Sequence, residues 1–508
     1  MRGPHNIWRL IRTGATFQRT GAMSAALDAM NAPPRVRLAA RLLGWPFAWL
    51  GYAGDPALPP VTRAITALGP AYIKFGQILS TRPDVVGPEM AQQLRVLQDR
   101  LPPFPTDTAR AMVLSELGAP VETLFATFSE PVAAASIAQV HRATRADTGA
   151  EVAVKVLRPG IEAAFRRDLD AFHFAASMIE GLSPSSRRLR PRDVVGHFES
   201  VVLGELDLRL EAASASEFAE NTRSDPGFSV PAPHWSRSAR RVMTTDWVEG
   251  IPMADVPAII AAGHDTHELA ERMIQLFLSH ALRDGFFHAD MHQGNLRVAP
   301  NGDIAAFDFG IMGEIDEYTR RVYAEILYGF IQRDYHRVAR VHFEAGYVPA
   351  DRDVAQFARA LRAVGEPIFG ADASQISMAN LLGYLFEVTE RFGMATRTEL
   401  ILLQRTMVVV EGVARTLDPQ INMWAAARPV VERYIRANLG PRAAARDSLR
   451  ILQTLGRHGP MLPQILDNHM SAMARPQVEP AAPRFTVSNW IIGGGLVVLG
   501  VVLGAVMG

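Results

Sequence analysis

Two short motifs near the middle of the chain constrain its fold and chemistry more than any other feature. The first, His288–Asn295, reads HADMHQGN, and the second, Asp308–Gly310, reads DFG. Between them, the segment Pro300–Asp303 reads PNGD, a composition that predicts the turn of a small hairpin. The two motifs are therefore expected to lie close together, although 12 residues separate Asn295 from Asp308 in the sequence.

The side chains of these motifs predict phosphoryl-transfer chemistry. This reaction needs carboxylate and amide oxygens on magnesium, together with an acceptor for the proton of the attacking group. Asp290 is the expected acceptor, while Asn295 and Asp308 are the expected magnesium ligands. A competing interpretation makes His288, Asp290 and His292 ligands of zinc or iron. A third makes both histidines core or loop residues that position the aspartate through hydrogen bonds.

A second set of motifs lies upstream and predicts a nucleotide-binding hairpin. Ala133, Ala134, Ala135 and Ser136 form a run of small residues that lets backbone amides approach a phosphate closely. Asp147–Ala150 reads as a turn, and valines then alternate along the strand-like segment that carries Lys155. An amine on an apolar strand beyond such a hairpin is how kinases hold the α- and β-phosphates of a nucleotide.

A kinase-type lysine needs a carboxylate partner on a neighbouring helix. The helical stretch from Val201 to Phe218 offers Glu205, Asp207 and Glu211, and spacing alone does not choose among them. Lysine occurs only at positions 74 and 155, whereas arginine supplies every other basic residue. This bias indicates two sites where a compact amine is required. Lys74 and Gln77 would share one face of a helix.

The composition excludes several classes of protein. The 508 residues are 48% apolar and 20% charged, as expected for a folded chain of two or three domains. With 52 basic and 52 acidic residues, the net charge is zero, which argues against nucleic acid as a partner. There is no cysteine, so disulfides, thiolate metal sites and cysteine nucleophiles are excluded.

The C-terminal segment predicts a membrane anchor. Residues 490–508 carry no charge and would extend about 28 Å as a helix, close to the thickness of the bilayer core. A proline-containing linker precedes them, and residues 1–60 lack the apolar run of a signal peptide. We therefore expect a tail-anchored protein with its bulk on the cytoplasmic side.

Together these motifs resemble those of the UbiB family of atypical protein-kinase-like proteins. The matching elements are a Lys-x-Gly-Gln signature at 74–77, the alanine-rich loop, Val-Ala-Val-Lys155, Glu205-x-Asp207, the HADMHQGN motif and DFG. One difference concerns topology, because such proteins often have two C-terminal spans and only one is found here.

The resemblance implies an α+β, protein-kinase-like bilobal fold with a helical N-terminal extension. Its expected parts are an amphipathic segment (1–60), an extension with the Lys-x-Gly-Gln motif (61–120), a mixed N-lobe (121–250), a helical C-lobe (251–470), a linker (471–489) and one transmembrane helix (490–508). Lys155 would pair with Glu205, and the helix carrying Lys74 and Gln77 would cover the cleft that binds Mg-ATP. Residues 133–136 would cover the nucleotide, and alanine in place of glycine there suits ATP hydrolysis better than phosphorylation of bulky proteins.

The implied function is that of an ATPase, or atypical phosphotransferase, that supports ubiquinone biosynthesis at the bacterial inner membrane. Its expected partners are membrane lipids, quinone precursors and other quinone-biosynthesis enzymes, and homodimer formation stays open. Two alternatives stand beside it. One is a catalytically quiet, nucleotide-gated scaffold or lipid chaperone, and the other is a kinase that acts on a small molecule or lipid.

Overall fold

The computed structural model describes residues 4–29, 34–80, 90, 93–94, 102–182, 191–370, 388, 391–394 and 398–438. These residues form two compact units. The first unit takes in the described residues up to 210 and residues 233–247, and the second takes in residues 211–232 and the described residues from 248 onward. The six-part division expected from the sequence stays a prediction.

Helices make up most of the first unit outside its sheet. They are α1 (Pro4–Thr20), α2 (Ala22–Ala29), α3 (Pro34–Gly44), η1 (Trp45–Leu50), α4 (Pro60–Leu68), α5 (Pro70–Ser80), α8 (Thr106–Leu117), α9 (Val121–Leu124), α10 (Ile161–Leu182) and α11 (Pro191–Glu205). The helical extension expected at 61–120 includes two separate helices, α4 and α5. Gly69, with φ of +111°, ends α4, and Pro70 begins α5 because proline has no N–H to continue the earlier helix.

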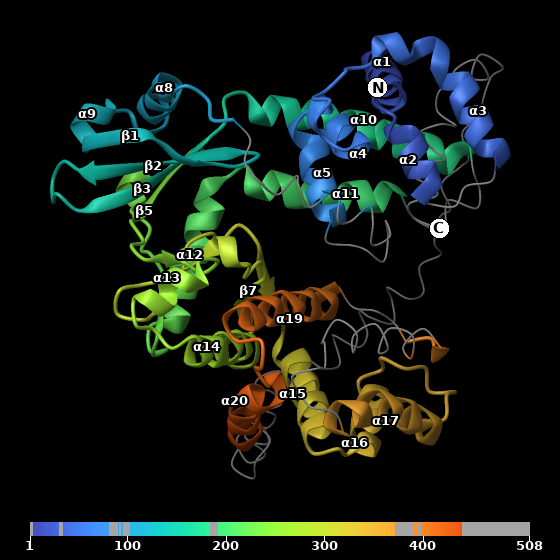
Figure 1. Ribbon diagram of the computed structural model, residues 1–508, viewed down its shortest axis with the longest axis vertical. Helices are drawn as coiled ribbons and strands as arrows, with labels where there is room; N and C mark the ends of the chain where they lie inside the picture. Colours follow the sequence, from blue (N-terminus) through green and yellow to red (C-terminus); the bar gives the residue numbers. More distant parts are fainter. Residues whose placement is uncertain are drawn as a thin grey trace, which may run out of the picture. The chain divides into compact units, whose positions relative to one another are not determined.

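The first unit also contains a four-stranded antiparallel sheet in the order β1-β2-β3-β5. Its strands are β1 (Phe125–Ala134), β2 (Ala138–Arg145), β3 (Glu151–Leu157) and β5 (Val242–Asp246). Val152, Val154 and Val156 are fully buried against Ala109 and Val113 of α8, and Figure 1 shows α8 beside this sheet. The alternation expected around Lys155 is therefore confirmed as a strand with one buried face.

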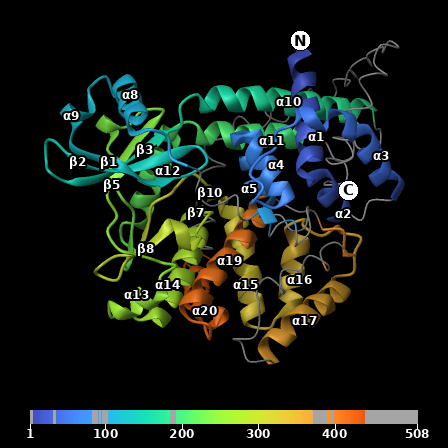
Figure 2. The ribbon, with the colours of Figure 1, turned by 45° about the horizontal axis from the view of Figure 1, so that its top comes forward.

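Two long helices lie side by side in this unit, as Figures 1 and 2 both show for α10 and α11. His173 Nε2 of α10 lies 2.5 Å from Glu199 Oε2 of α11 and links them. The single helix expected from Val201 to Phe218 is wrong. Helix α11 ends at Glu205, and a second helix, α12 (Leu208–Thr222), begins three residues later.

The second unit is mainly helical, as expected. Its helices are α13 (Val256–Ala261), α14 (Thr266–Ser279), α15 (Glu317–Ile331), α16 (Tyr335–Glu344), α17 (Val354–Gly370), α19 (Thr398–Leu417) and α20 (Met423–Asn438). Its short strands are β4 (Phe228–Ser229), β6 (Ile251–Pro252), β7 (Phe286–His288), β8 (Leu296–Val298), β9 (Ile304–Ala306) and β10 (Met312–Glu314). The hairpin expected at 300–303 is confirmed, since β8 and β9 flank it and Gly302 has φ of +84°.

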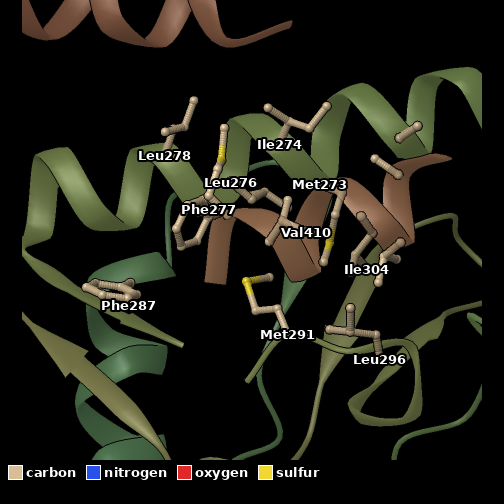
Figure 3. Packing of buried hydrophobic residues seen from close by; sticks show 14 of the residues in the cluster. Met273, Ile274, Leu276, Phe277, Leu278, Phe287, Met291, Leu296, Ile304 and Val410 are labelled. Carbon is tan, nitrogen blue, oxygen red and sulfur yellow. The ribbon is translucent and has the colours of Figure 1, made fainter. Parts of the chain in front are cut away.

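A hydrophobic core holds the motif-bearing loops of the second unit in place. Figure 3 shows Met273 and Phe277 of α14, Ile304 of β9 and Val410 of α19 around Met291. Met291, between Asp290 and His292, is fully buried. The loop is thus anchored from within its own motif, because withdrawing this side chain would expose apolar surface.

The expected transmembrane helix at 490–508 and its linker lie outside the described residues. Within the part of the chain that the structure describes, no helix combines the length and apolar character needed to cross a bilayer.

Candidate functional site

The strand lysine lies in the middle of the sheet of the first unit. Lys155 of β3 is opposite Val140 of β2 and Met243 of β5. Its neighbours Val154 and Val156 point into the core, so the side chain of Lys155 leaves the opposite face and is only partly exposed. This is the arrangement that the alternating pattern predicts for an amine offered to a ligand.

The small-residue run is not helical, because its first two alanines end β1 and its last two residues lie in the turn that leads to β2. Ala134 is paired with Gln139, and Ala135 N donates to Ala138 O at 2.8 Å. Arg158 fixes this turn, because its backbone N donates to Ile137 O at 2.8 Å and its Nε to Ala135 O at 3.1 Å. No sequence pattern singled out Arg158, since one arginine after a strand carries no distinctive spacing.

The Lys-x-Gly-Gln helix is docked through an aromatic side chain. Phe75 of α5 packs against Phe172 of α10 and Phe198 of α11, with ring centroids 5.9 and 5.3 Å apart. Gly76, the next residue of the same helix, is buried. This packing places the helix that carries Lys74 and Gln77 beside the end of α11.

Lys74 and Glu205 form a direct ion pair. Lys74 Nζ lies 2.6 Å from Glu205 Oε1, and the two side chains are only 15% and 8% exposed. This contact joins the Lys-x-Gly-Gln and Glu-x-Asp motifs directly. Their residue patterns predict only that both motifs contribute to the same cleft. The expected pairing of Lys155 with Glu205 stays a prediction.

The other two candidate carboxylates have different surroundings. Asp207 accepts hydrogen bonds from Arg209 Nη2 and Nε at 2.6 and 2.9 Å, and this guanidinium holds the pKa of Asp207 below its usual range. Glu211 lies on α12 and is buried. Glu205 is paired with a motif lysine, Lys74, at short distance.

The loop around Asp290 is held by hydrogen bonds to its backbone N–H and C=O groups, most of them with side chains. Asp290 N donates to His288 Nδ1 at 3.1 Å, and His292 N donates to Asp290 O at 2.9 Å. Asn295 Nδ2 donates to the same oxygen, Asp290 O, at 3.1 Å. On the other side of the loop, Thr406 Oγ1 of α19 donates to Ala289 O at 3.1 Å. These contacts fix the backbone of Asp290, and its carboxylate Oδ2 lies 3.6 Å from His292 Nε2.

Asn295 and Asp308 lie at the same end of the β8–β9 hairpin. Leu296 is paired with Ala306, and Phe307 N donates to Asn295 O at 3.3 Å, just before Asp308. Asp308 Oδ1 accepts a hydrogen bond from Gly310 N at 3.1 Å. An amide oxygen and a carboxylate are both hard donors of the kind that Mg²⁺ prefers, so these two residues fit a magnesium ion.

The hydrogen bonds of the loop histidines favour the third interpretation, most directly at His288, which contacts Asp290. Both Nδ1 atoms accept backbone hydrogen bonds, His288 from Asp290 N and His292 from Gly294 N at 3.0 Å. Burial lowers the pKa of His288 to about 4, so its ring is neutral at pH 7. Within the described residues no cluster of histidine and carboxylate side chains has the makings of a metal site, which speaks against the zinc or iron interpretation.

These features define a class of protein. A β-hairpin turn of small residues, a strand lysine, an Asp-x4-Asn loop and a DFG hairpin are the parts of a protein-kinase-like protein. Residues 96–342 match the family model of the ABC1 atypical kinase-like domain, and residues 361–422 match that of the UbiB helical domain.

Known proteins agree with this class and narrow it. A probable protein kinase UbiB from Marinobacter nauticus is 41% identical over 79% of this chain and 74% of its own length. Another, from Azotobacter vinelandii, is 38% identical over 92% of this chain and 87% of its own. The chain therefore belongs to the UbiB family of atypical kinase-like proteins.

A solved structure also shares the fold. It is the complex of Rv3197 with erythromycin from Mycobacterium tuberculosis, with 26% sequence identity and a TM-score of 0.51. The similarity covers 71% of this chain and 92% of the other. The kinase-like fold expected from the motifs is thereby confirmed.

Proposed function

We propose that this protein is an atypical kinase-like ATPase that binds Mg-ATP and supports ubiquinone biosynthesis. Membership of the UbiB family supports the class of activity, and the relatives named as probable protein kinases support the phosphoryl chemistry. The observation that carries the proposal is the shared position of Asn295 and Asp308 at one end of a hairpin, beside the loop that bears Asp290.

The expected roles follow from the chemistry of each side chain. Asn295 and Asp308 would hold magnesium, which when bound neutralises charge on the phosphate oxygens. Asp290 would accept the proton of the attacking water or hydroxyl group. Lys155 would hold the nucleotide phosphates as a compact positive charge, and the hairpin turn at 133–136 would cover the nucleotide.

Lys74, Gln77 and Glu205 belong to the proposal as a positioning group. Glu205 is largely buried and paired with Lys74. Lys74 therefore compensates the negative charge of Glu205, and breaking the pair would leave that charge to act on other groups nearby. A Lys-x-Gly-Gln helix held in this way would restrict access of bulky protein substrates, which favours hydrolysis or work on a lipid.

The cellular setting is part of the proposal. We place the protein at the bacterial inner membrane, anchored through residues 490–508, with membrane lipids and quinone precursors as partners. Other quinone-biosynthesis enzymes are expected partners as well.

The test uses the purified full chain in detergent, with Asp308→Asn as the main variant. Losing this carboxylate should abolish magnesium-dependent ATP binding, measured by calorimetry, and ATP hydrolysis. Asp303→Asn is the matched control, because Asp303 lies in the turn at the opposite end of the same hairpin. This control variant should bind Mg-ATP normally. Undiminished Mg-ATP binding by Asp308→Asn would refute the assignment.

Two further functions can be separated by experiment. A scaffold that only binds nucleotide would keep ubiquinone production in cells carrying Asp290→Asn, whereas an ATPase would lose it. A small-molecule kinase is supported by the structural neighbour that holds erythromycin, an alcohol-bearing ligand. A screen for phosphate transfer to polyprenyl phenols and to macrolides tests that alternative directly.

A further inference from the structure

The N-terminal helices present large apolar side chains to solvent. We call this set, together with Arg12, Arg37 and Arg41, the N-terminal face. Its apolar members are Trp8, Leu38, Leu42, Phe47, Trp49 and Tyr52. Trp49 is 74% exposed and Leu42 65% exposed. Side chains of this size in one segment mark an interaction surface rather than scattered surface residues.

The exposure is built into the packing and does not come from a loose terminus. Arg19 Nη1 donates to Gly51 O at 2.7 Å, and Tyr52 N donates to Thr16 Oγ1 at 3.0 Å. Gly51 approaches α1 so closely that a Cβ there would lie 2.4 Å from Ala15 O. The segment that carries Trp49 is thus docked tightly on α1 by its backbone while its aromatic side chain faces outward.

Helix α3 has the pattern of a helix that lies in a membrane interface. Leu38 and Leu42 are four residues apart and exposed, so they form one stripe. Arg37 and Arg41, also exposed, form a basic stripe next to it, and Arg37 Nη1 lies 2.6 Å from Asp28 Oδ1 in an exposed ion pair that a lipid phosphate would have to replace. Ala40 is buried and faces the protein. Adjacent apolar and basic stripes on the outward side are what an anionic bilayer surface accepts.

Charge favours a lipid surface over another protein of this kind. Residues 1–52 contain seven arginines and one acidic residue, Asp28, so their formal charge is 7 − 1 = +6. The whole chain is neutral, so the remainder carries −6. In the folded chain Asp168 of α10 pairs with Arg9, so the segment together with this carboxylate carries 6 − 1 = +5. Two copies meeting through this face would bring like charges together, whereas an anionic bilayer complements it.

Aromatic and basic groups are also combined within the face. The Arg12 guanidinium lies 5.6 Å from the ring centroid of Trp8 and 5.3 Å from that of Tyr52. Tryptophan and tyrosine favour the level of the lipid headgroups, and an arginine between them can reach a headgroup phosphate.

From these observations we infer that the N-terminal face binds the surface of an anionic phospholipid bilayer. Leu38, Leu42 and Trp49 enter the boundary between headgroups and acyl chains, and Arg37 and Arg41 contact phosphates. None of the residues of this face is among those proposed to bind Mg-ATP or to form the anchor at 490–508, so the inference holds whether or not those proposals do.

The absence of cysteine allows a direct test in the full chain. A single Leu42→Cys variant is labelled with an environment-sensitive dye and reconstituted into vesicles that carry a shallow spin-labelled lipid. Leu114→Cys is the matched control, because Leu114 is an exposed leucine of the first unit on α8. We expect blue-shifted, quenched fluorescence at position 42 in vesicles with 30% phosphatidylglycerol, and little change at position 114.

Charge and salt provide the second arm. Arg37→Glu with Arg41→Glu, or 0.5 M salt, should reduce quenching at position 42 by about half or more. Asp308→Asn should leave it unchanged, so this test and the nucleotide test fail independently. Equal quenching at positions 42 and 114 would overturn the inference, and so would equal quenching in vesicles of pure phosphatidylcholine. A blue shift at position 42 in the absence of vesicles, caused by self-association of the protein, would overturn it as well.

Discussion

Lys74 and Glu205 show how one pair of side chains can join motifs that lie far apart in the sequence. They are 131 positions apart in the sequence, yet their charged atoms are 2.6 Å apart in a largely buried setting. A buried ion pair contributes little against an apolar substitute, but removing one partner leaves a charge without compensation. Separating the two motifs would therefore lower the free energy of unfolding, because it would leave a buried charge unpaired.

This coupling can be measured with a double-mutant cycle. Lys74→Met and Glu205→Gln are each expected to lower the free energy of unfolding by about 3 kcal/mol, and the double variant by clearly less than the sum. Urea unfolding of the full chain in detergent provides the measurement. Arg209→Gln, which breaks the more exposed pair with Asp207, should change the free energy of unfolding far less than either variant. Strict additivity would show that Lys74 and Glu205 do not interact.

Among the elements, α16 packs against its neighbours through a buried imidazole. His342 Nδ1 donates to Val338 O at 2.8 Å, and the ring contacts Tyr347 and Phe357 edge-on. Burial lowers the pKa of His342 to about 4 from an ordinary value of 6.5. The neutral ring therefore belongs to the folded state, and helix packing depends on its not being protonated.

The sign of the pH dependence follows from this difference. Between pH 6.5 and about 4 the unfolded state binds a proton that the folded state does not, so stability falls as the pH falls through this window. Each pKa unit corresponds to about 1.4 kcal/mol. His342→Phe should lessen the loss of stability between pH 7 and 5, measured by urea unfolding.

The control for this prediction is a histidine whose pKa is shifted in the opposite direction. Asp418 raises the pKa of the exposed His267, so that pair stabilises the folded state at lower pH and loses this contribution as the pH rises. His267→Gln should therefore alter the slope only slightly, and toward a steeper loss on acidification. An unchanged slope in His342→Phe would contradict the prediction.

At the scale of the whole molecule, the described chain has two compact units with separate cores. Val113, Val152 and Phe125 belong to the core beside the first sheet, whereas Phe277 and Met291 belong to the core of the second unit. Chains built in this way often depart from two-state unfolding, because each core can be lost by itself.

Hydrogen exchange can test this independence. Phe277→Ala removes a fully buried ring and should lower the stability of the second unit by about 3–5 kcal/mol. Amide exchange measured by mass spectrometry should then accelerate in α14, α19 and β8–β9, while β1–β3 keep their protection. Phe125→Ala is the reciprocal variant and should accelerate exchange in β1–β3 alone. Faster exchange throughout the chain in both variants would show a single cooperative unit.

Local patterns were sufficient for much of the fold and part of the site. The strand of Lys155, the turn at 147–150 and the β8–β9 hairpin follow from alternation and turn composition, which depend on neighbours in sequence. Strands β7 and β10 were not expected, because three residues are too few to show a period. The break between Glu205 and Leu208 was also missed, since a helical run of acids and apolar residues continues across it.

The sequence by itself determined the family, the order of the motifs and the side chains expected to hold magnesium and phosphate, because these rest on residue type and spacing. Only the tertiary structure decided that Lys74 pairs with Glu205 and that both loop histidines accept hydrogen bonds from backbone amides. It also decided that Leu38, Leu42, Phe47 and Trp49 are exposed. Each of these depends on which surfaces meet when distant segments pack, and no local pattern encodes that choice.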